Sequence, residues 1–318
     1  MDDLAYPWEL DAQFVISTLT VLYYCYILVI TMRSKSETFR SPFFIIFRFT
    51  GLFDIIGNIA VEWVRTDRKS GFGPSIEPFT RVMYAMTGVT FFTHLIGSLL
   101  MTVNRYMAVC FPWAYGKIWT HRNVYIMLFV DVIVSIVVHT QIFFVRLIYM
   151  QGNDKWETIG REVPIPVRFT PLLSMYIYSQ VASVSSLKVV RAISGSAAII
   201  YGCISVVVIS RTMYVTLQLS KKSARHQKTG LVIFVAVDCL LGLVDCIYEA
   251  ADLFGLSTAN VVFVWISANI TTLMFLILSI NAYSMTFLSQ ELRMEAIAPC
   301  RKKKRTTTFT TTVVLSRN

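Results

Sequence analysis

Long apolar stretches recur along the chain and are separated by short polar segments. A membrane-spanning α-helix needs about 20 mostly apolar residues. Seven stretches meet this requirement, at residues 14–32, 43–64, 79–111, 124–150, 192–219, 231–254 and 261–286. Because a backbone inside lipid has to satisfy its own hydrogen bonds, these stretches predict α-helices. The expected fold class is therefore all-α, a seven-transmembrane helix bundle.

The composition agrees with a membrane bundle and does not support an enzyme. Hydrophobic residues make up 55% of the chain and charged residues 15%, whereas soluble domains carry about 25% charged residues. The sequence contains no glycine-rich phosphate loop, no HExxH zinc motif and no paired-cysteine metal motif. We therefore expect no catalytic residues, no metal site, no cofactor and no nucleic-acid partner.

Basic residues are distributed unevenly between the two sides of the predicted bundle. The chain carries acidic residues and no Lys or Arg up to Met32. The first, second and third loops on the other side are basic, with Arg33, Lys35, Arg40, Lys117, Arg122, Lys221, Lys222, Arg225 and Lys228. Cytoplasmic loops carry an excess of Lys and Arg. The distribution predicts that the N-terminus is outside and the C-terminus is cytoplasmic.

Residues 1–286 form the predicted transmembrane domain, and residues 287–318 form a predicted cytoplasmic tail. Cys300 precedes the basic run 301–305, and a threonine-rich segment follows at 306–312. A cysteine beside basic residues is a candidate for palmitoylation, with the basic run attracted to anionic membrane lipids. A free cytosolic thiol is the alternative interpretation. Phosphorylation of the threonines would offer a site for an arrestin-like partner.

The longest outer connection runs from Gln151 to Arg191. Its prolines predict an extended first half. Residues 172–190 are moderately apolar and serine-rich, and three interpretations remain open: a lid, an extension of helix five, or a membrane-embedded segment. None of the six cysteines lies in a predicted outer loop. A disulfide between helix three and this connection is therefore not expected.

Polar and ionisable side chains interrupt several of the predicted spans. Helix two carries Asp54, Asn58 and Glu62 at four-residue steps, which places them near one face. Helix three carries a polar side that includes His94 and Ser98. Such groups usually face the bundle interior or a water-filled cavity and mark function. The competing interpretation is that they are hydrogen-bonding groups that only hold the helices together.

Aromatic and acidic residues gather in the outer halves of helices two, three, six and seven. These candidate ligand-binding residues are Glu62, Tyr84, Thr87, Phe91, Asp245, Tyr248, Glu249 and Trp265. Carboxylates and aromatic faces favour a neutral or cationic small molecule. Outer arginines such as Arg65 and Arg81 offer an alternative, in which the acids are neutralised by salt bridges.

The third predicted helix ends in Asn104-Arg105-Tyr106, which resembles the acid-Arg-Tyr motif of rhodopsin-like receptors. The wider pattern includes Arg40-Ser41-Pro42-Phe43-Phe44, Gly51-Leu52-Phe53-Asp54, Phe111-Pro112 and Lys117-Ile118-Trp119. Together these motifs resemble the nematode serpentine chemoreceptors of the gamma superfamily, most closely class V, with class gamma as the near alternative.

This resemblance implies a plasma-membrane chemoreceptor, in the cilia of sensory neurons, that works in sensory transduction such as olfaction. It would bind an external small molecule and activate a heterotrimeric G protein. The implied coupling residues are Asn104, Arg105, Tyr106, Lys221, Lys222 and Arg225. The alternative class is a seven-helix transporter or ligand-gated channel subunit, although no repeated halves or Gly/Pro-broken helices are visible.

The chain also departs from the rhodopsin-like pattern at functionally important positions. Asn104 replaces the acid, so a carboxylate at this position cannot hold Arg105. The predicted interior polar cluster comprises Asp54, Asn58, His94, Ser98 and Asn281. In rhodopsin-like receptors, groups equivalent to Asp54 and Asn281 help hold a sodium ion. Here a His94 imidazolium would take the place of the cation, or His94 is a neutral hydrogen-bonded core residue.

Overall fold

The computed structural model describes residues 12–151, 156–162, 185–220 and 261–297. Within these residues, six helices are long and apolar enough to span a membrane. They are α1 (Ala12–Arg33), α2 (Pro42–Ser70), α3 (Glu77–Cys110), α5 (His121–His139), α7 (Ser185–Ser220) and α10 (Ile270–Leu288). The predicted span 231–254 lies outside the described residues. The described helices agree with the all-α bundle expected from the sequence.

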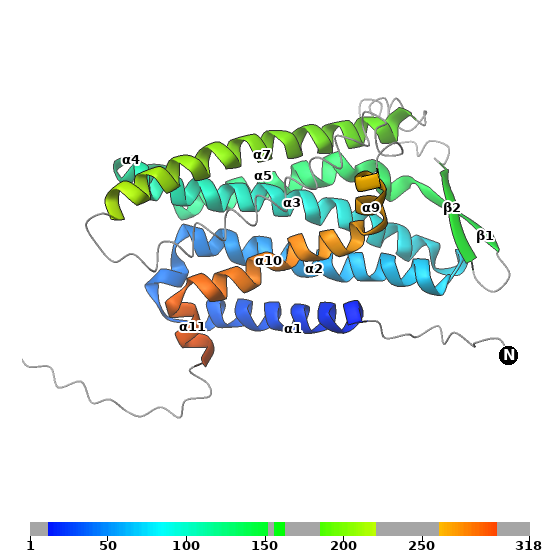
Figure 1. The fold of residues 1–318 in the computed structure, drawn as a ribbon, viewed down its shortest axis with the longest axis horizontal. Coiled ribbons are helices and arrows are strands. Elements are labelled where there is room, and N and C mark those ends of the chain that lie inside the picture. The colour runs from blue at the N-terminus through cyan, green and yellow to red at the C-terminus, as the bar shows by residue number, and fades with distance from the viewer. Residues whose placement is uncertain (1–11, 152–155, 163–184, 221–260, 298–318) are drawn as a thin grey trace, which may run out of the picture.

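The long helices lie roughly parallel or antiparallel along one axis (Figure 1). A β-hairpin of β1 (Arg146–Gln151) and β2 (Trp156–Glu162) lies at one end, here called the hairpin end. Two short helices, α4 (Pro112–Ile118) and α11 (Gln290–Ile297), lie at the other, here called the α11 end. Both α7 and α10 run from the hairpin end toward the α11 end.

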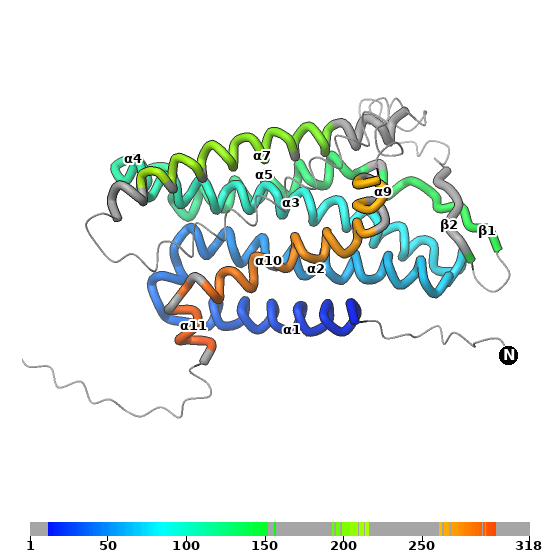
Figure 2. Tube along the Cα trace, in the orientation of Figure 1, coloured from blue at the N-terminus to red at the C-terminus, as the bar shows by residue number. Residues whose placement is uncertain are grey.

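Helices from the two ends of the sequence pack against each other. α1 and α10 lie side by side (Figure 2). Thr20 Oγ1 and Tyr283 Oη are 2.8 Å apart, and the Tyr23 hydroxyl donates to Thr286 Oγ1 at 2.6 Å. The rings of Tyr23 and Tyr283 stack with centroids 5.2 Å apart. These contacts close the bundle between its first and last described spans.

Local sequence signals set the limits of α2. Ser41 precedes the helix and Pro42 occupies its first turn, where the missing proline N–H removes no helical hydrogen bond. The helix continues past the predicted limit at residue 64 to Ser70. It ends at Gly71, whose φ of 61° is the left-handed conformation typical of a helix C-cap. The polar turn from Arg65 to Ser70 therefore extends the helix beyond its apolar stretch.

Small residues allow close contact between α2 and α3. A Cβ atom on Gly97 of α3 would lie 2.1 Å from Oγ1 of Thr50 on α2. A Cβ atom on Gly57 of α2 would lie 2.6 Å from Oγ1 of Thr90 on α3. Helices in membranes associate largely by van der Waals packing, and glycines let their backbones approach. These two glycines bring the polar faces of α2 and α3 together.

The predicted fourth span, 124–150, is wrong at its outer end. α5 ends at His139, a 3-10 helix follows at η3 (Thr140–Phe144), and residues 146–151 form strand β1. The apolar side chains of Val145 and Leu147 are buried in the protein. Their hydrophobicity therefore reflects packing at the hairpin end and not contact with lipid, which a hydropathy pattern cannot distinguish.

Two other predicted spans also differ in their limits. The predicted helix 261–286 is divided into α9 (Val261–Ala268) and α10 at Asn269, whose side-chain amide donates to the Trp265 carbonyl at 2.9 Å. α7 begins at Ser185, so residues 185–190 extend helix five. The rest of the open segment, residues 172–184, lies outside the described residues.

The β-hairpin is attached non-covalently to the connection between α2 and α3. The Leu147 backbone N–H donates to Oε1 of Glu77, in the first turn of α3, at 3.1 Å. The Trp156 N–H donates to the Gly71 carbonyl at 3.4 Å. The Trp156 ring covers Gly73, where a Cβ atom would lie 2.4 Å from Cδ1 and φ is 83°. These contacts hold the β-hairpin against the start of α3 and the turn that precedes it.

The Glu77 attachment leads to a specific prediction. In Glu77→Ala, the buried Leu147 N–H loses its acceptor, at a cost of about 1–3 kcal/mol. We expect faster hydrogen exchange at the amides of β1 and β2, with little change in α1. Glu37→Ala is the matched control because Glu37 is exposed at the α11 end of the molecule. Unchanged exchange of the hairpin amides in Glu77→Ala would contradict this role.

Candidate functional site

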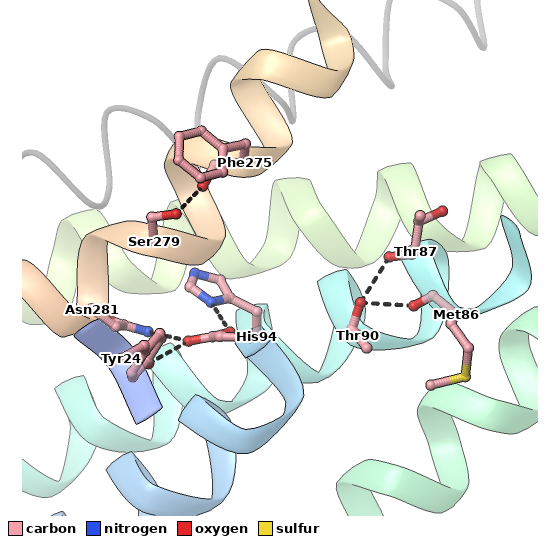
Figure 3. A network of polar contacts seen from close by, with 9 residues as sticks. Tyr24, Met86, Thr87, Thr90, His94, Phe275, Ser279 and Asn281 are labelled. Carbon is pink, nitrogen blue, oxygen red and sulfur yellow. Dashed lines mark hydrogen bonds and ion pairs between the residues drawn. The ribbon is translucent and has the colours of Figure 1, made fainter. Parts of the chain in front are cut away.

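Asp54 lies at the centre of a polar cluster in the bundle interior. Its side chain is 0% exposed. Tyr24 Oη donates to Oδ2 at 2.7 Å, and Asn281 Nδ2 donates to the same oxygen at 3.3 Å. His94 Nδ1 lies 2.7 Å from Oδ1. Figure 3 shows Tyr24, His94 and Asn281 converging from three different helices. Four helices, α1, α2, α3 and α10, therefore meet at one carboxylate.

The Asp54–His94 contact has the geometry of a buried ion pair. His94 is 1% exposed, and its Nδ1 faces the carboxylate. A protonated Nδ1 donates to Oδ1 whether the ring is neutral or an imidazolium, so the contact alone does not define the charge. The expected association of Asp54, His94 and Asn281 is present. The replacement of a bound cation by His94 stays a prediction.

The other two members of the predicted interior cluster do not join this network. Asn58 and Ser98 are buried, but neither side chain has a hydrogen-bond partner among the described residues. Asn58 lies one helical turn beyond Asp54 on α2, and Ser98 lies one turn beyond His94 on α3. Because α2 and α3 run in opposite directions, these two residues flank the Asp54–His94 pair on opposite sides.

Arg105 lies toward the α11 end of α3 and is half-buried. Its guanidinium carbon lies 4.2 Å from the centroid of the Phe43 ring, in a cation–π contact. Its Nη2 donates to Met285 Sδ at 3.5 Å. Among the described residues, no carboxylate forms a salt bridge with Arg105. Apolar and aromatic side chains from α2 and α10 therefore hold this cation in place.

Asn104, which occupies the position of the missing acid, contacts the loop helix α4. Its side chain is buried, and both its amide atoms approach the Tyr115 hydroxyl, at 3.3 Å from Nδ2 and 3.4 Å from Oδ1. Tyr106 packs edge-on against Phe111, with centroids 5.7 Å apart. Tyr115 was not predicted as a site residue, although it lies between the Phe111-Pro112 and Lys117-Ile118-Trp119 motifs. The remaining predicted coupling residues, Lys221, Lys222 and Arg225, lie outside the described residues.

The predicted ligand-binding residues do not form one contiguous cluster in the described residues. Glu62 is buried and pairs with Arg65 on its own helix. Arg68 Nη2 donates to the Tyr84 hydroxyl at 3.5 Å, and Thr87 Oγ1 donates to the Tyr84 carbonyl at 2.8 Å. The Glu62–Arg65 pair agrees with the alternative in which outer arginines neutralise the acids.

The aromatic ligand candidates lie in different environments. Phe91 is half-buried and packs against the cluster of Leu95 and Tyr201, between α3 and α7. Trp265 is 60% exposed on α9. The remaining candidates, Asp245, Tyr248 and Glu249, lie outside the described residues. The ligand-binding role of this set therefore stays a prediction.

A second buried polar network joins α3 to α5, and sequence analysis missed it. Thr93 Oγ1 donates to Ser135 Oγ at 3.0 Å, and Ser135 Oγ donates to Asp131 Oδ1 at 3.2 Å. His139 Nδ1 lies 2.9 Å from the Ser135 carbonyl, and its ring occupies the space beside Gly88. The available signal was Asp131 itself, a single acid within a long apolar stretch.

Helix α11 continues the chain after α10 and packs against the C-terminal end of α1. Leu292 is fully buried in the main core, and the Tyr26 hydroxyl donates to the Ala296 carbonyl at 2.7 Å. Ser34 Oγ donates to Oε1 of Glu295 at 3.0 Å. These contacts attach α11 to the end of α1. Cys300, the basic run and the threonine-rich segment lie outside the described residues.

Comparison with known proteins identifies the family of this chain. No curated protein matches it significantly. The family model described as serpentine type 7TM GPCR chemoreceptor Srv matches residues 13–301, which cover the described spans from residue 13 onward and the Asn104-Arg105-Tyr106 motif. A match over nearly the whole chain agrees with the resemblance seen in the sequence motifs. The chain therefore belongs to the Srv family of serpentine seven-transmembrane chemoreceptors.

Proposed function

We propose that this membrane chemoreceptor binds an external small molecule and activates a heterotrimeric G protein at the cytoplasmic side of the plasma membrane. The observation that carries the proposal is Arg105, a cation at the α11 end of α3 that has no carboxylate partner among the described residues. No described carboxylate competes for this cation, so a helix movement that breaks its contacts with Phe43 and Met285 would make it available to a partner. By resemblance to nematode chemoreceptors, the receptor would act in the cilia of sensory neurons.

The charge at the α11 end supports the same partner. Arg33, Lys35, Arg40, Lys117 and Arg122 are all exposed there or in the adjoining loops. A basic surface of this kind is complementary to acidic and polar groups on a G protein, and complementary potentials speed encounter. Membrane lipids and an arrestin-like protein are further proposed partners of the tail, residues 287–318.

The proposed mechanism couples the two ends of the transmembrane domain, residues 1–286. Ligand binding near the hairpin end would favour one of two helix arrangements, because a ligand shifts an equilibrium by its difference in affinity for the two states. The Asp54 cluster connects four helices midway along the bundle. Movement of α3 relative to α2 and α10 would change the contacts of Arg105 with Phe43 and Met285.

A cellular screen tests the proposed function. Cells that express the receptor are exposed to a panel of volatile and water-soluble chemicals, and nucleotide exchange on co-expressed G proteins is measured. We expect at least one compound to raise exchange in receptor-bearing cells and not in matched cells without the receptor. A compound that evokes ionic current in the absence of exchange would instead support the channel alternative.

The membrane orientation can be tested independently of any ligand. We expect an epitope tag at the N-terminus to be stained in intact cells, and a tag at the C-terminus to be stained only after permeabilisation. The reason is the excess of basic residues at the α11 end. The opposite staining pattern would reverse the orientation and remove Arg105 from the cytoplasmic side.

A further inference from the structure

Asp131 lies in the middle of the α5 span and is not used by the proposed coupling mechanism. Its side chain is 2% exposed, and it faces α3 through the Thr93–Ser135–Asp131 hydrogen bonds. Ser135 and Thr93 are fully buried. The network is therefore sealed from solvent and from lipid, and any charge on Asp131 has to be balanced within the protein.

The hydrogen bonds around Asp131 leave one oxygen unsatisfied. The Thr93 hydroxyl donates to Ser135, and the Ser135 hydroxyl donates to Asp131 Oδ1. Both hydroxyl protons are used in this chain. Oδ2 is buried and has no hydrogen-bond partner among the described residues. Oδ2 lacks a described partner in either form, but burying an unpaired charged oxygen costs far more than burying an unpaired neutral hydroxyl, so this site favours the neutral acid.

No described cation balances a negative charge at this position. On α5, His139 uses Nδ1 at the Ser135 carbonyl and lies two turns away from Asp131. On α3 and α2, His94 and Asp54 contact each other, and the Arg48 Nε donates to the Phe44 carbonyl. Asp131 forms no hydrogen bond or ion pair with the described titratable side chains of α7, which are Tyr201, Cys203, Arg211 and Tyr214. An unpaired buried carboxylate normally takes up a proton.

The buried acids Asp54 and Asp131 differ in the number of hydrogen-bond partners that surround them. Asp54 accepts from Tyr24 and Asn281 at one oxygen and faces His94 at the other. Asp131 receives one hydroxyl donor and has no cation among the described residues. Several hydrogen-bond donors favour the ionised form, whereas burial with few donors favours the neutral form.

We propose that Asp131 is a proton-binding site: it holds one proton on Oδ2 as a neutral carboxylic acid, while its carbonyl oxygen Oδ1 accepts from Ser135. The carboxylate takes this proton from a hydronium ion: one O–H bond of hydronium breaks, one O–H bond forms at Oδ2, and a water molecule is released as the two charges cancel. Asp131 then joins α5 to α3 as a neutral hydrogen-bonding group. This inference does not depend on the ligand or on G-protein coupling.

Infrared difference spectroscopy of the purified full-length receptor tests the proposal. We expect the wild type minus Asp131→Asn spectrum to contain one carbonyl-stretch band of a protonated carboxylic acid. Ser135→Ala should retain this band and move it to higher frequency, because the carbonyl oxygen Oδ1 loses the hydroxyl that donates to it. Asp54→Asn, confirmed as folded by its helical content, is the control and should retain the band unshifted.

An ionised Asp131 would give different infrared spectra. If Asp131 is ionised, Asp131→Asn removes carboxylate bands and leaves the acid carbonyl region unchanged, and Ser135→Ala has no effect in that region. Either of these results overturns the proposal. If Asp131→Asn does not fold, the proposal is tested with Ser135→Ala alone. This variant preserves the Asp131 carboxyl group and removes only one hydroxyl, so a shift of the acid carbonyl band can still be measured.

Discussion

Replacing Arg105 with alanine is expected to reduce agonist-driven nucleotide exchange about 100-fold, near the upper end of the coupling free energies of about 1–3 kcal/mol typical of allosteric proteins. The substitution removes the cation that lies over Phe43 and contacts Met285. Because no described carboxylate pairs with Arg105, its loss leaves no buried acid without a partner. The effect should therefore fall on coupling more than on folding.

Two further variants distinguish a coupling role from a general loss of charge. Arg105→Lys keeps the positive charge but loses the planar group that stacks on Phe43, so we expect a partial loss of exchange. Arg146→Ala removes an exposed arginine from β1 at the hairpin end, away from the basic surface proposed for the G protein, and should retain near wild-type exchange. Exchange is compared at equal surface density. If Arg105→Ala supports normal nucleotide exchange, the coupling role assigned to Arg105 by resemblance to rhodopsin-like receptors is wrong.

Replacing Asp54 with alanine is expected to lower the free energy of unfolding by about 3–5 kcal/mol, because three buried groups each lose a hydrogen-bond partner at a cost of about 1–3 kcal/mol. Three side chains, Tyr24, His94 and Asn281, lose their shared acceptor in this variant. The measurement is the denaturation of the detergent-solubilised receptor followed by helical content. Ser34→Ala, which removes a hydroxyl from an exposed contact with Glu295, is a control with little expected change.

A double-mutant cycle with Asp54→Ala and His94→Ala measures the strength of the Asp54–His94 contact. A coupling energy of about 3 kcal/mol or more would support the imidazolium–carboxylate pair, whereas about 1 kcal/mol is the value of an ordinary neutral hydrogen bond. The first result supports the interpretation that His94 replaces a bound cation. Additive effects of the two substitutions would contradict a direct interaction, despite the 2.7 Å separation.

The positions of the spans were largely predictable because the signal is local. Apolar stretches of sufficient length predicted α1, α2, α3 and α7 with shifts of a few residues at most ends. The error at residues 146–151 has the same origin. An apolar stretch that packs under a hairpin has the composition of one that faces lipid, so hydropathy alone placed β1 in the fourth span.

Pairwise contacts between distant residues were less predictable. Spacing on α2 and α3 indicated that Asp54 and His94 face the interior, and resemblance added Asn281. Nothing in the sequence indicated that Tyr24 of α1 is the fourth member, because a tyrosine in a membrane span is common and its partner is 30 residues away. Tyr115, which contacts Asn104, and Glu77, which holds Leu147, were missed for the same reason.

The sequence by itself determined the class of the protein, the number of expected crossings and their alternating direction, because a bilayer imposes length, apolarity and internal backbone hydrogen bonds on each segment separately. Only the tertiary structure decided which polar groups are satisfied. Three side chains, from α1, α3 and α10, meet at Asp54 of α2, whereas Asp131 meets a single hydroxyl from its own helix. Whether a buried acid is paired depends on side chains brought together by helix packing, and that information is not contained in any one segment.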